Sequence, residues 1–243
     1  MNKDIIFGMQ PVLEAIKSGT EIDKILVQKN VGVETSKELY FLIKKFNIPF
    51  QKVPAEKLNK YTRKTHQGVI ALVSSVSFAN LDQVLGNVYN EGRDPFLLLL
   101  DRVTDVRNFG AIVRTAECAG VDAIVVPARG SAALNADAMK TSAGALNYVP
   151  ICRAKYLVDE MKYLKESGVF MVGMTEKTEQ NIYQADISGP VALVMGSEEN
   201  GISSEVMDLC DLTVKIPMIG SIGSLNVSVA AGIGLYEIIR RRQ

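Results

Sequence analysis

The spacing of apolar residues changes near residue 95 of this 243-residue chain. Beyond that point, short apolar runs alternate with segments of helical periodicity, around 111–119 and 157–166 among others. The runs lie at 96–100, 121–126, 169–174, 191–195 and 212–216. Continuous apolar strands separated by helices are typical of a parallel sheet covered on both faces. We therefore predict an α/β fold with a mostly parallel sheet over residues 95–243.

The first 76 residues carry shorter elements. The pattern predicts strands at 5–7, 23–28, 50–53 and 69–76 and a helix at 11–17. It also predicts a second helix that begins with a capping box at 35–38 and ends at residue 46. Together these elements predict a small α/β module at residues 1–76. Residues 77–94 are weakly patterned, with break signals at Gly86, Gly92 and the following Pro95, so they are predicted to be a linker.

Composition narrows the possible chemistry. The chain has three cysteines without a CxxC pair and one histidine, His66, which argues against a disulfide framework, a metal site and a histidine-based catalytic triad. No apolar run reaches 18 residues, so no membrane partner is expected. The first residues lack the pattern of a signal peptide, and we expect a cytoplasmic protein.

The net charge of zero hides an asymmetry. Residues 1–76 hold 12 Lys and Arg against 7 Asp and Glu, whereas residues 77–243 hold 15 against 20. A basic module could bind a polyanion while the rest of the chain binds something else. A merely solvated lysine-rich surface explains the surplus equally well.

Ligands of open parallel sheets bind at the carboxyl ends of the strands, which directs attention to the loops after Leu100, Met174, Met195 and Ile216. In the first loop, Asn108 suits a helix N-cap, and Arg114 would lie about one turn into the helix. The helix dipole disfavours a cation there by about 0.3–1 kcal/mol. This suggests that Arg114 holds an anion, although pairing with Glu117 is an alternative.

Two later loops are also rich in polar residues. After Met195, Gly196 and Gly201 flank a pair of carboxylates, of which Glu198 is expected to be partly desolvated; Ser203 is expected to cap the next helix. After Ile216, the residues Ser224, Asn226 and Ser228 are more polar than a helix cap requires. The helix that follows is apolar nearly all round and ends in Arg240-Arg241-Arg242, so it should be buried or lie at a subunit interface. Its arginines suit the negative end of the helix dipole, with RNA contact as the alternative.

These loops together resemble the SpoU family (SPOUT superfamily) of S-adenosylmethionine-dependent RNA ribose 2′-O-methyltransferases. The matching residues are Asn108, Gly110 and Arg114-Thr115-Ala116, then Gly196, Glu198, Gly201 and Ser203, then Ile216-Pro217-Met218 and Ser224-Leu225-Asn226-Val227-Ser228. The segments Phe7-Gly8-Met9-Gln10-Pro11-Val12 and His66-Gln67-Gly68-Val69 resemble the small RNA-binding domain that precedes the bacterial enzymes. The nearest resemblance is to the group that methylates a guanosine of large-subunit (23S) rRNA.

The resemblance implies a methyltransferase domain at 95–243 with a C-terminal trefoil knot, S-adenosylmethionine as cofactor, no metal, and a homodimer formed through the last helix. It implies a cofactor site at Gly196, Ile216, Leu225, Met218 and Met195, and a reacting group of Asn108, Arg114, Glu198, Ser224 and Asn226. RNA recognition is expected from the basic module through Arg63, Lys64, His66 and Gln67. Arg107 and the pair Glu199-Asn200 depart from the usual pattern and are expected at the rim, where they bear on substrate choice. Arg107 is expected to bind RNA there.

The family assigns the ribose proton to the motif arginine. A guanidinium is essentially always protonated, so we expect Arg114 to hold a phosphate and stabilise the developing alkoxide, while Ser224, Asn226 or a water relays the proton. Two alternatives stay open: a tRNA ribose methyltransferase of the same family, and a non-catalytic RNA-binding protein with this fold.

Overall fold

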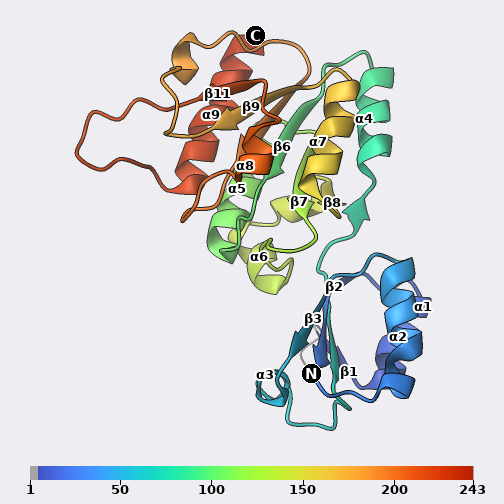
Figure 1. Cartoon of the computed structure of the whole chain (residues 1–243). Helices are drawn as coiled ribbons and strands as arrows, with labels where there is room; N and C mark the ends of the chain where they lie inside the picture. Colours follow the sequence, from blue (N-terminus) through green and yellow to red (C-terminus); the bar gives the residue numbers. More distant parts are fainter. Residues whose placement is uncertain (1–4, 243) are drawn as a thin grey trace. The chain divides into compact units, whose positions relative to one another are not determined.

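The computed structural model describes residues 5–242, which fall into two compact units (Figure 1). The first unit runs to Ser77 and includes residues 133–136; the second holds 78–132 and 137 onward. None of the helices in this described range is long and apolar enough to cross a bilayer.

The first unit is a four-stranded sheet with helices on both faces. Its strands are β1 (Ile5–Phe7), β2 (Ile22–Gln28), β3 (Phe50–Val53) and β4 (Val69–Val73), in the order β1-β4-β2-β3. Only the β2–β3 pair is parallel. Helices α1 (Met9–Lys17) and α2 (Val33–Lys45) cover one face with side chains such as Leu13 and Leu39, and α3 (Ala55–Asn59) buries Leu58 against the other.

Two predicted boundaries in this unit differ from the structure. Helix α2 begins at Val33, after Gly32, and not at a capping box at 35–38. Ser36 therefore lies inside the helix, where its hydroxyl donates to the carbonyl of Gly32 at 2.9 Å. The last strand ends at Val73, because Ser74 turns the chain. The hydroxyl of Ser74 donates to the carbonyl of Val76 and accepts from the amide of Val76.

The second unit is built on a seven-stranded sheet in which every pair is parallel, as predicted. The strand order is β11-β9-β10-β6-β7-β8-β5. The strands are β5 (Phe78–Ala79), β6 (Phe96–Leu100), β7 (Ala123–Pro127), β8 (Ile151–Ala154), β9 (Phe170–Met174), β10 (Val191–Met195) and β11 (Leu212–Val214). Strand β8 was not among the predicted runs.

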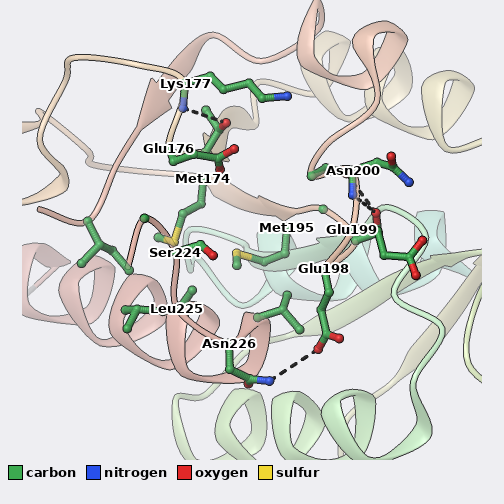
Figure 2. A pocket seen from close by; sticks show the side chains of 18 of the residues that line it. Met174, Glu176, Lys177, Met195, Glu198, Glu199, Asn200, Ser224, Leu225 and Asn226 are labelled. Carbon is green, nitrogen blue, oxygen red and sulfur yellow. Dashed lines mark hydrogen bonds between the residues drawn. The ribbon is translucent and has the colours of Figure 1, made fainter. Parts of the chain in front are cut away.

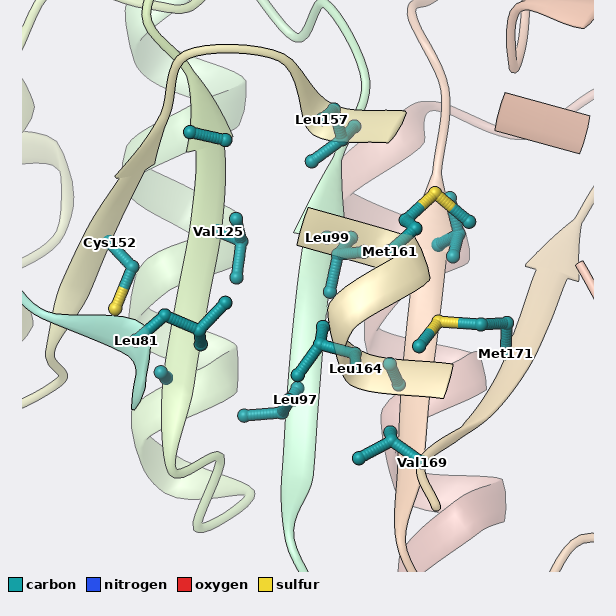
Figure 3. Packing of buried hydrophobic residues seen from close by; sticks show 14 of the residues in the cluster. Leu81, Leu97, Leu99, Val125, Cys152, Leu157, Met161, Leu164, Val169 and Met171 are labelled. Carbon is teal, nitrogen blue, oxygen red and sulfur yellow. The ribbon is translucent and has the colours of Figure 1, made fainter. Parts of the chain in front are cut away.

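Helices cover both faces of this sheet. On one face lie α4 (Leu81–Asn90), α7 (Leu157–Glu166) and α8 (Ser204–Met207). Figure 3 shows Met161 and Leu164 of α7 packed over Leu97 and Leu99 of β6. On the other face lie α5 (Val106–Cys118) and α9 (Val227–Arg242), and the short elements α6 (Ala136–Thr141), η1 (Ala145–Asn147) and η2 (Ile182–Gln184) complete the unit.

The prediction that residues 77–94 form a linker is wrong. These residues form β5 and α4, and Asn80 caps α4 by accepting the amide hydrogen of Gln83 at 3.0 Å. Leu81 and Leu85 enter the core of the second unit. Burial of these leucines stabilises the unit by about 1.5–3 kcal/mol each, so the segment belongs to its hydrophobic core.

The C-terminal helix α9 contains a buried carboxylate. Glu237 is only 6% exposed and accepts hydrogen bonds from Arg240 (2.7 and 2.9 Å) and from Arg241 (2.8 Å). The hydrogen bond from Arg240 is the main reason why the pKa of Glu237 lies below its ordinary value in spite of burial. Two of the terminal arginines are thus paired with this buried carboxylate, Arg240 from an exposed position and Arg241 from a half-buried one, and Arg242 donates to the carbonyl of Asp94.

We expect Glu237→Gln to lower the free energy of unfolding at pH 7 by about 1–3 kcal/mol, because the arginines lose their charged partner. A carboxyl whose pKa is lowered by folding stabilises the protein above its ordinary pKa, 4.5, and this contribution disappears as the pH falls below it. Denaturant unfolding at pH 7 and near pH 3 should therefore show the gap between variant and wild type closing in acid. The exposed Glu117→Gln is the control; a gap that persists in acid would contradict the assignment.

Candidate active site at the carboxyl edge of the sheet

The loop after β6 places Asn108 inside helix α5, not at its N-cap. Asp105 is the cap, and its Oδ1 accepts the amide hydrogens of Arg107 and Asn108, each at 2.9 Å. The predicted cap at Asn108 is therefore wrong. Its side chain is free to point away from the backbone, and Arg107 is exposed beside it.

The turn after β10 is closed by backbone contacts that only glycine permits. A Cβ on Gly196 would lie 2.0 Å from the carbonyl carbon of Gly201 and 2.1 Å from the nitrogen of Ile202. Ser197 and Gly201 exchange two backbone hydrogen bonds, at 3.1 and 2.9 Å. The turn holds Glu198 at its tip, exposed and not partly desolvated as expected. Ser203 occupies the N-cap of α8 as predicted, although its side chain makes no capping bond.

The third segment, 216–225, leaves its backbone unused. None of its N–H or C=O groups forms a hydrogen bond with another residue of the range 5–242. Its apolar side chains are exposed as well, with Ile219 at 101% and Ile222 at 76%. Because residues 217–225 are exposed, these backbone groups can bind water or a ligand.

Three predicted residues meet: Asn108 of α5, Glu198 of the turn after β10, and Asn226, which directly follows the third segment. Asn108 donates from Nδ2 to Oε1 of Glu198, and Asn226 donates from Nδ2 to the same oxygen at 3.4 Å and to Oδ1 of Asn108 at 3.1 Å. The amide oxygen of Asn226 accepts from the backbone and hydroxyl of Ser228, at 2.9 and 2.5 Å. We call Asn108, Glu198 and Asn226 the amide–carboxylate cluster.

A cavity of about 730 Å³ adjoins this cluster; we call it the large cavity (Figure 2). All five predicted cofactor residues line it: Met195, Gly196, Ile216, Met218 and Leu225. Glu198, Ser224 and Asn226 line it too, together with Met174, and Figure 2 labels these residues around the cavity. Its size lies within the range of small-molecule and cofactor sites.

The loop after β9 supplies wall residues that the sequence interpretation did not name. Thr175, Glu176 and Lys177 line the large cavity together with Met174. The available signal was their position: they directly follow a buried strand of a parallel sheet, at the edge where ligands bind. No motif singles them out, so only this rule could have identified them.

Arg114 is not among the residues that line the large cavity. Helix α5 begins at Val106, so Arg114 is more than two turns into it, and the dipole argument used to assign it a role fails. The alternative partner is absent too, because within residues 5–242 Arg114 is exposed and pairs with neither Glu117 nor any other group. In this chain Arg114 is thus separate from the cluster that it was predicted to join.

The residues proposed to contact RNA in the first unit divide into two kinds. Arg63 and Lys64 are exposed. His66 and Gln67, in contrast, form hydrogen bonds within the unit. Nδ1 of His66 accepts from the amide of Gly68 at 3.0 Å, and its Nε2 lies 3.0 Å from Oδ1 of Asn59. Oε1 of Gln67 accepts from the amide of Met9 at 3.0 Å. The described part of the chain contains no group of His, Cys, Asp and Glu side chains that could hold a metal ion.

Two family models match the chain. Residues 95–236 match the SpoU rRNA Methylase family, and residues 5–79 match a domain described as RNA 2′-O ribose methyltransferase substrate binding. The two matches correspond to the second and first units.

Proteins of similar sequence carry related names. A Bacillus subtilis protein, YacO, is 35% identical over 98% of this chain and 96% of its own, and its name assigns it to the TrmH family of tRNA/rRNA methyltransferases. A Staphylococcus epidermidis protein with the same family name is 38% identical over 100% of this chain and 97% of its own.

Solved structures of similar fold include the SpoU methyltransferase AviRb from Streptomyces viridochromogenes in complex with AdoMet. It superposes with a TM-score of 0.61 at 25% identity, over 98% of this chain and 89% of its own. The TrmH/SpoU tRNA-modifying enzyme of A. aeolicus superposes with a TM-score of 0.55 at 31% identity, over 66% of this chain and 83% of its own.

Proposed function

Because the chain belongs to the SpoU rRNA methylase family and is an S-adenosylmethionine-dependent RNA ribose methyltransferase, we propose that it methylates the 2′-hydroxyl of a guanosine in large-subunit (23S) rRNA. The observation that carries this proposal is the amide–carboxylate cluster beside the large cavity. It brings together one polar residue from each of three loops at the carboxyl edge of the sheet, where such a reaction needs fixed partners.

The large cavity fits S-adenosylmethionine. Met174, Met195, Ile216 and Leu225 offer apolar walls for an adenine ring, and the unpaired backbone of 216–225 offers donors and acceptors for its edge. We propose that Gly196 acts here through its backbone, and that Met218 covers the site. When bound, the cofactor supplies an electrophilic sulfonium methyl group; the chain supplies alignment and handles the ribose proton.

The hydrogen bonds suggest how the proton is handled. Both polar atoms of the Asn226 side chain are engaged, so we assign Asn226, together with Asn108, the task of holding Glu198 in place. Ser224 lines the same cavity and its hydroxyl has no partner within 5–242. Ser224, with a water beyond it, is therefore our candidate for relaying the proton from the 2′-hydroxyl.

Arg114 requires a second chain in this proposal. Helix α5, which carries it, packs on α9, and α9 keeps apolar side chains exposed, Val229 at 50% and Tyr236 at 53%. An exposed apolar surface of this kind is typical of an interface. We propose a homodimer through α9 in which Arg114 of one protomer reaches the cluster of its partner and binds the substrate phosphate.

Other features extend the proposal. A trefoil knot near the C-terminus is part of the proposal because the resemblance of residues 95–236 to the SpoU family implies it. The basic first unit is proposed to bind RNA through Arg63 and Lys64, with His66 and Gln67 shaping that loop and Arg107 at the rim of the active site. The cytoplasm, where bacteria make rRNA, is the proposed location, since the similar proteins are bacterial.

The test is methyl transfer from labelled S-adenosylmethionine to total tRNA, small-subunit rRNA and unmodified large-subunit rRNA. We expect label only in large-subunit rRNA, at a single 2′-O-methylated guanosine found by mapping reverse-transcription stops. Label in tRNA would favour the second candidate, which the similarity to the A. aeolicus tRNA-modifying enzyme supports. Absence of label in every RNA would leave a binding protein that retains the fold.

A further inference from the structure

A second, smaller cavity shares a wall with the large one. It measures about 300 Å³; we call it the small cavity. Arg102 and Asp105 line it on one side and the turn 197–200 on the other. The turn 197–200 borders both cavities, so Glu198 of the amide–carboxylate cluster lies between them.

Hydrogen bonds to Asp101, which is 5% exposed, hold these walls in position. Its Oδ1 accepts from Nε of Arg102 at 3.1 Å, and its Oδ2 accepts from the amide of Ser203 at 2.6 Å. Arg102 also donates from Nη2 to the carbonyl of Gly201 at 3.3 Å. The loop after β6 is thereby tied to the loop after β10, which preforms the space between them.

The polar groups of the small cavity favour a neutral ligand that donates hydrogen bonds. Its one basic residue, Arg102, is already paired, whereas three carboxylates line it. Asp105 caps α5 and Glu198 accepts from two amides, but Glu199 has no partner within residues 5–242. Figure 2 shows the side chain of Glu199 pointing away from Met174 and Met195 of the large cavity.

A nucleobase matches this chemistry and this size. Enzymes that do chemistry on a base turn it out of the stack and read its edge in a pocket. The small cavity offers such a pocket beside the place assigned to the ribose. A carboxylate pairs with two adjacent N–H groups, and guanine alone of the four bases presents such a pair, N1–H and the 2-amino group. Adenine and cytosine place a ring acceptor beside the amino group, and uracil places a carbonyl on each side of its one N–H.

We propose that the small cavity receives the base of the nucleotide being methylated, and that Glu199 selects guanine by accepting from N1–H and the 2-amino group. The ribose of the same nucleotide would then lie across Glu198, next to the large cavity. This inference rests on the proposed function and adds a residue that determines specificity.

The test is a double-mutant cycle that combines Glu199→Gln in the protein with replacement of guanosine by inosine in the RNA. The substrate is a transcript of the large-subunit rRNA segment that contains the mapped position, carrying there either guanosine or inosine, which lacks the 2-amino group. With wild type, inosine should lower kcat/KM by roughly tenfold to a hundredfold. Glu199→Gln should lower kcat/KM on guanosine to a similar degree, mainly through KM, yet methylate the inosine RNA almost as well as wild type does.

Glu205→Gln, an exposed change on α8, is the matched control and should retain the preference for guanosine. Calorimetry should show that Glu199→Gln binds S-adenosylmethionine within a few-fold of wild type. An undiminished guanosine preference in Glu199→Gln, or a loss of cofactor affinity equal to the loss in kcat/KM, would overturn the inference. A wild-type enzyme that methylates a different nucleoside would overturn it while leaving methyltransferase function intact, whereas methylation of no RNA would refute the proposed function itself.

Discussion

Replacement of Arg114 by alanine should reduce methyl transfer by at least about a hundredfold, the loss typical when a group that stabilises charge in a transition state is removed. Arg114 is exposed and does not line the large cavity. The affinity of the variant for S-adenosylmethionine should therefore stay within a few-fold of the wild-type affinity. Single-turnover kinetics and calorimetry measure the two effects separately. Arg114→Lys should recover little activity, because an ammonium lacks the planar fork that binds phosphate through two hydrogen bonds.

Complementation between two inactive variants tests whether Arg114 acts across the dimer. In a mixed dimer of Arg114→Ala and Asn226→Ala, one of the two sites would combine an intact cluster with an intact arginine. Activity should then reappear on co-expression. Mixed dimers without activity would show that Arg114 acts in the active site of its own chain. If Arg114→Ala loses as much cofactor affinity as turnover, the role assigned to Arg114 is wrong.

Gly196→Ala should prevent cofactor binding and destabilise the second unit. The added methyl group would lie about 2 Å from the backbone of Gly201 and Ile202, which cannot move without opening the turn. Overpacking of this kind costs roughly 1–3 kcal/mol or more. Opening the turn would also displace Glu198 from its two amide donors.

Thermal unfolding with and without S-adenosylmethionine measures both consequences for Gly196→Ala. Gly86→Ala is the matched control: it lies in α4 with no atom within 4 Å of the new methyl group. That change should raise stability by about 0.5–1 kcal/mol, as alanine does in helices. A Gly196→Ala protein that is as stable as wild type and binds the cofactor would show that the turn can adjust.

Apolar periodicity was sufficient to predict the sheet of the second unit because its strands are buried on both faces and therefore read as continuous apolar runs. It failed for β8, which is only four residues long and contains Arg153. It also failed at α4, where Leu81, Leu85 and Val88 follow helical spacing but Gly86 was taken as an interruption. Short elements with one unfavourable residue carry too little signal on their own.

The sequence predicted which loops form the site but not which of their side chains contact one another. Asp105 and Asn108 are both good capping residues, and only the structure shows that Asp105 caps the helix and leaves Asn108 for Glu198. The contact between Asn108 and Asn226 joins residues 118 positions apart, a relation that spacing cannot encode. The isolation of Arg114 was equally hidden, because it depends on where helix α5 begins.

The order of strands also determines when each unit can form during synthesis. The sheet of the first unit is complete once Val73 has been made. In the second unit, β6 is made early but its neighbour β10 begins only at Val191, and β9 must wait for β11 as its outer partner. Domains of a nascent chain generally fold as units, the N-terminal one first, while pairing between distant strands is slow. The newly made protein would therefore carry the finished sheet of the basic module while β6 has β7 on one side but not yet β10 on the other. During this interval its apolar strands depend most on protection from aggregation.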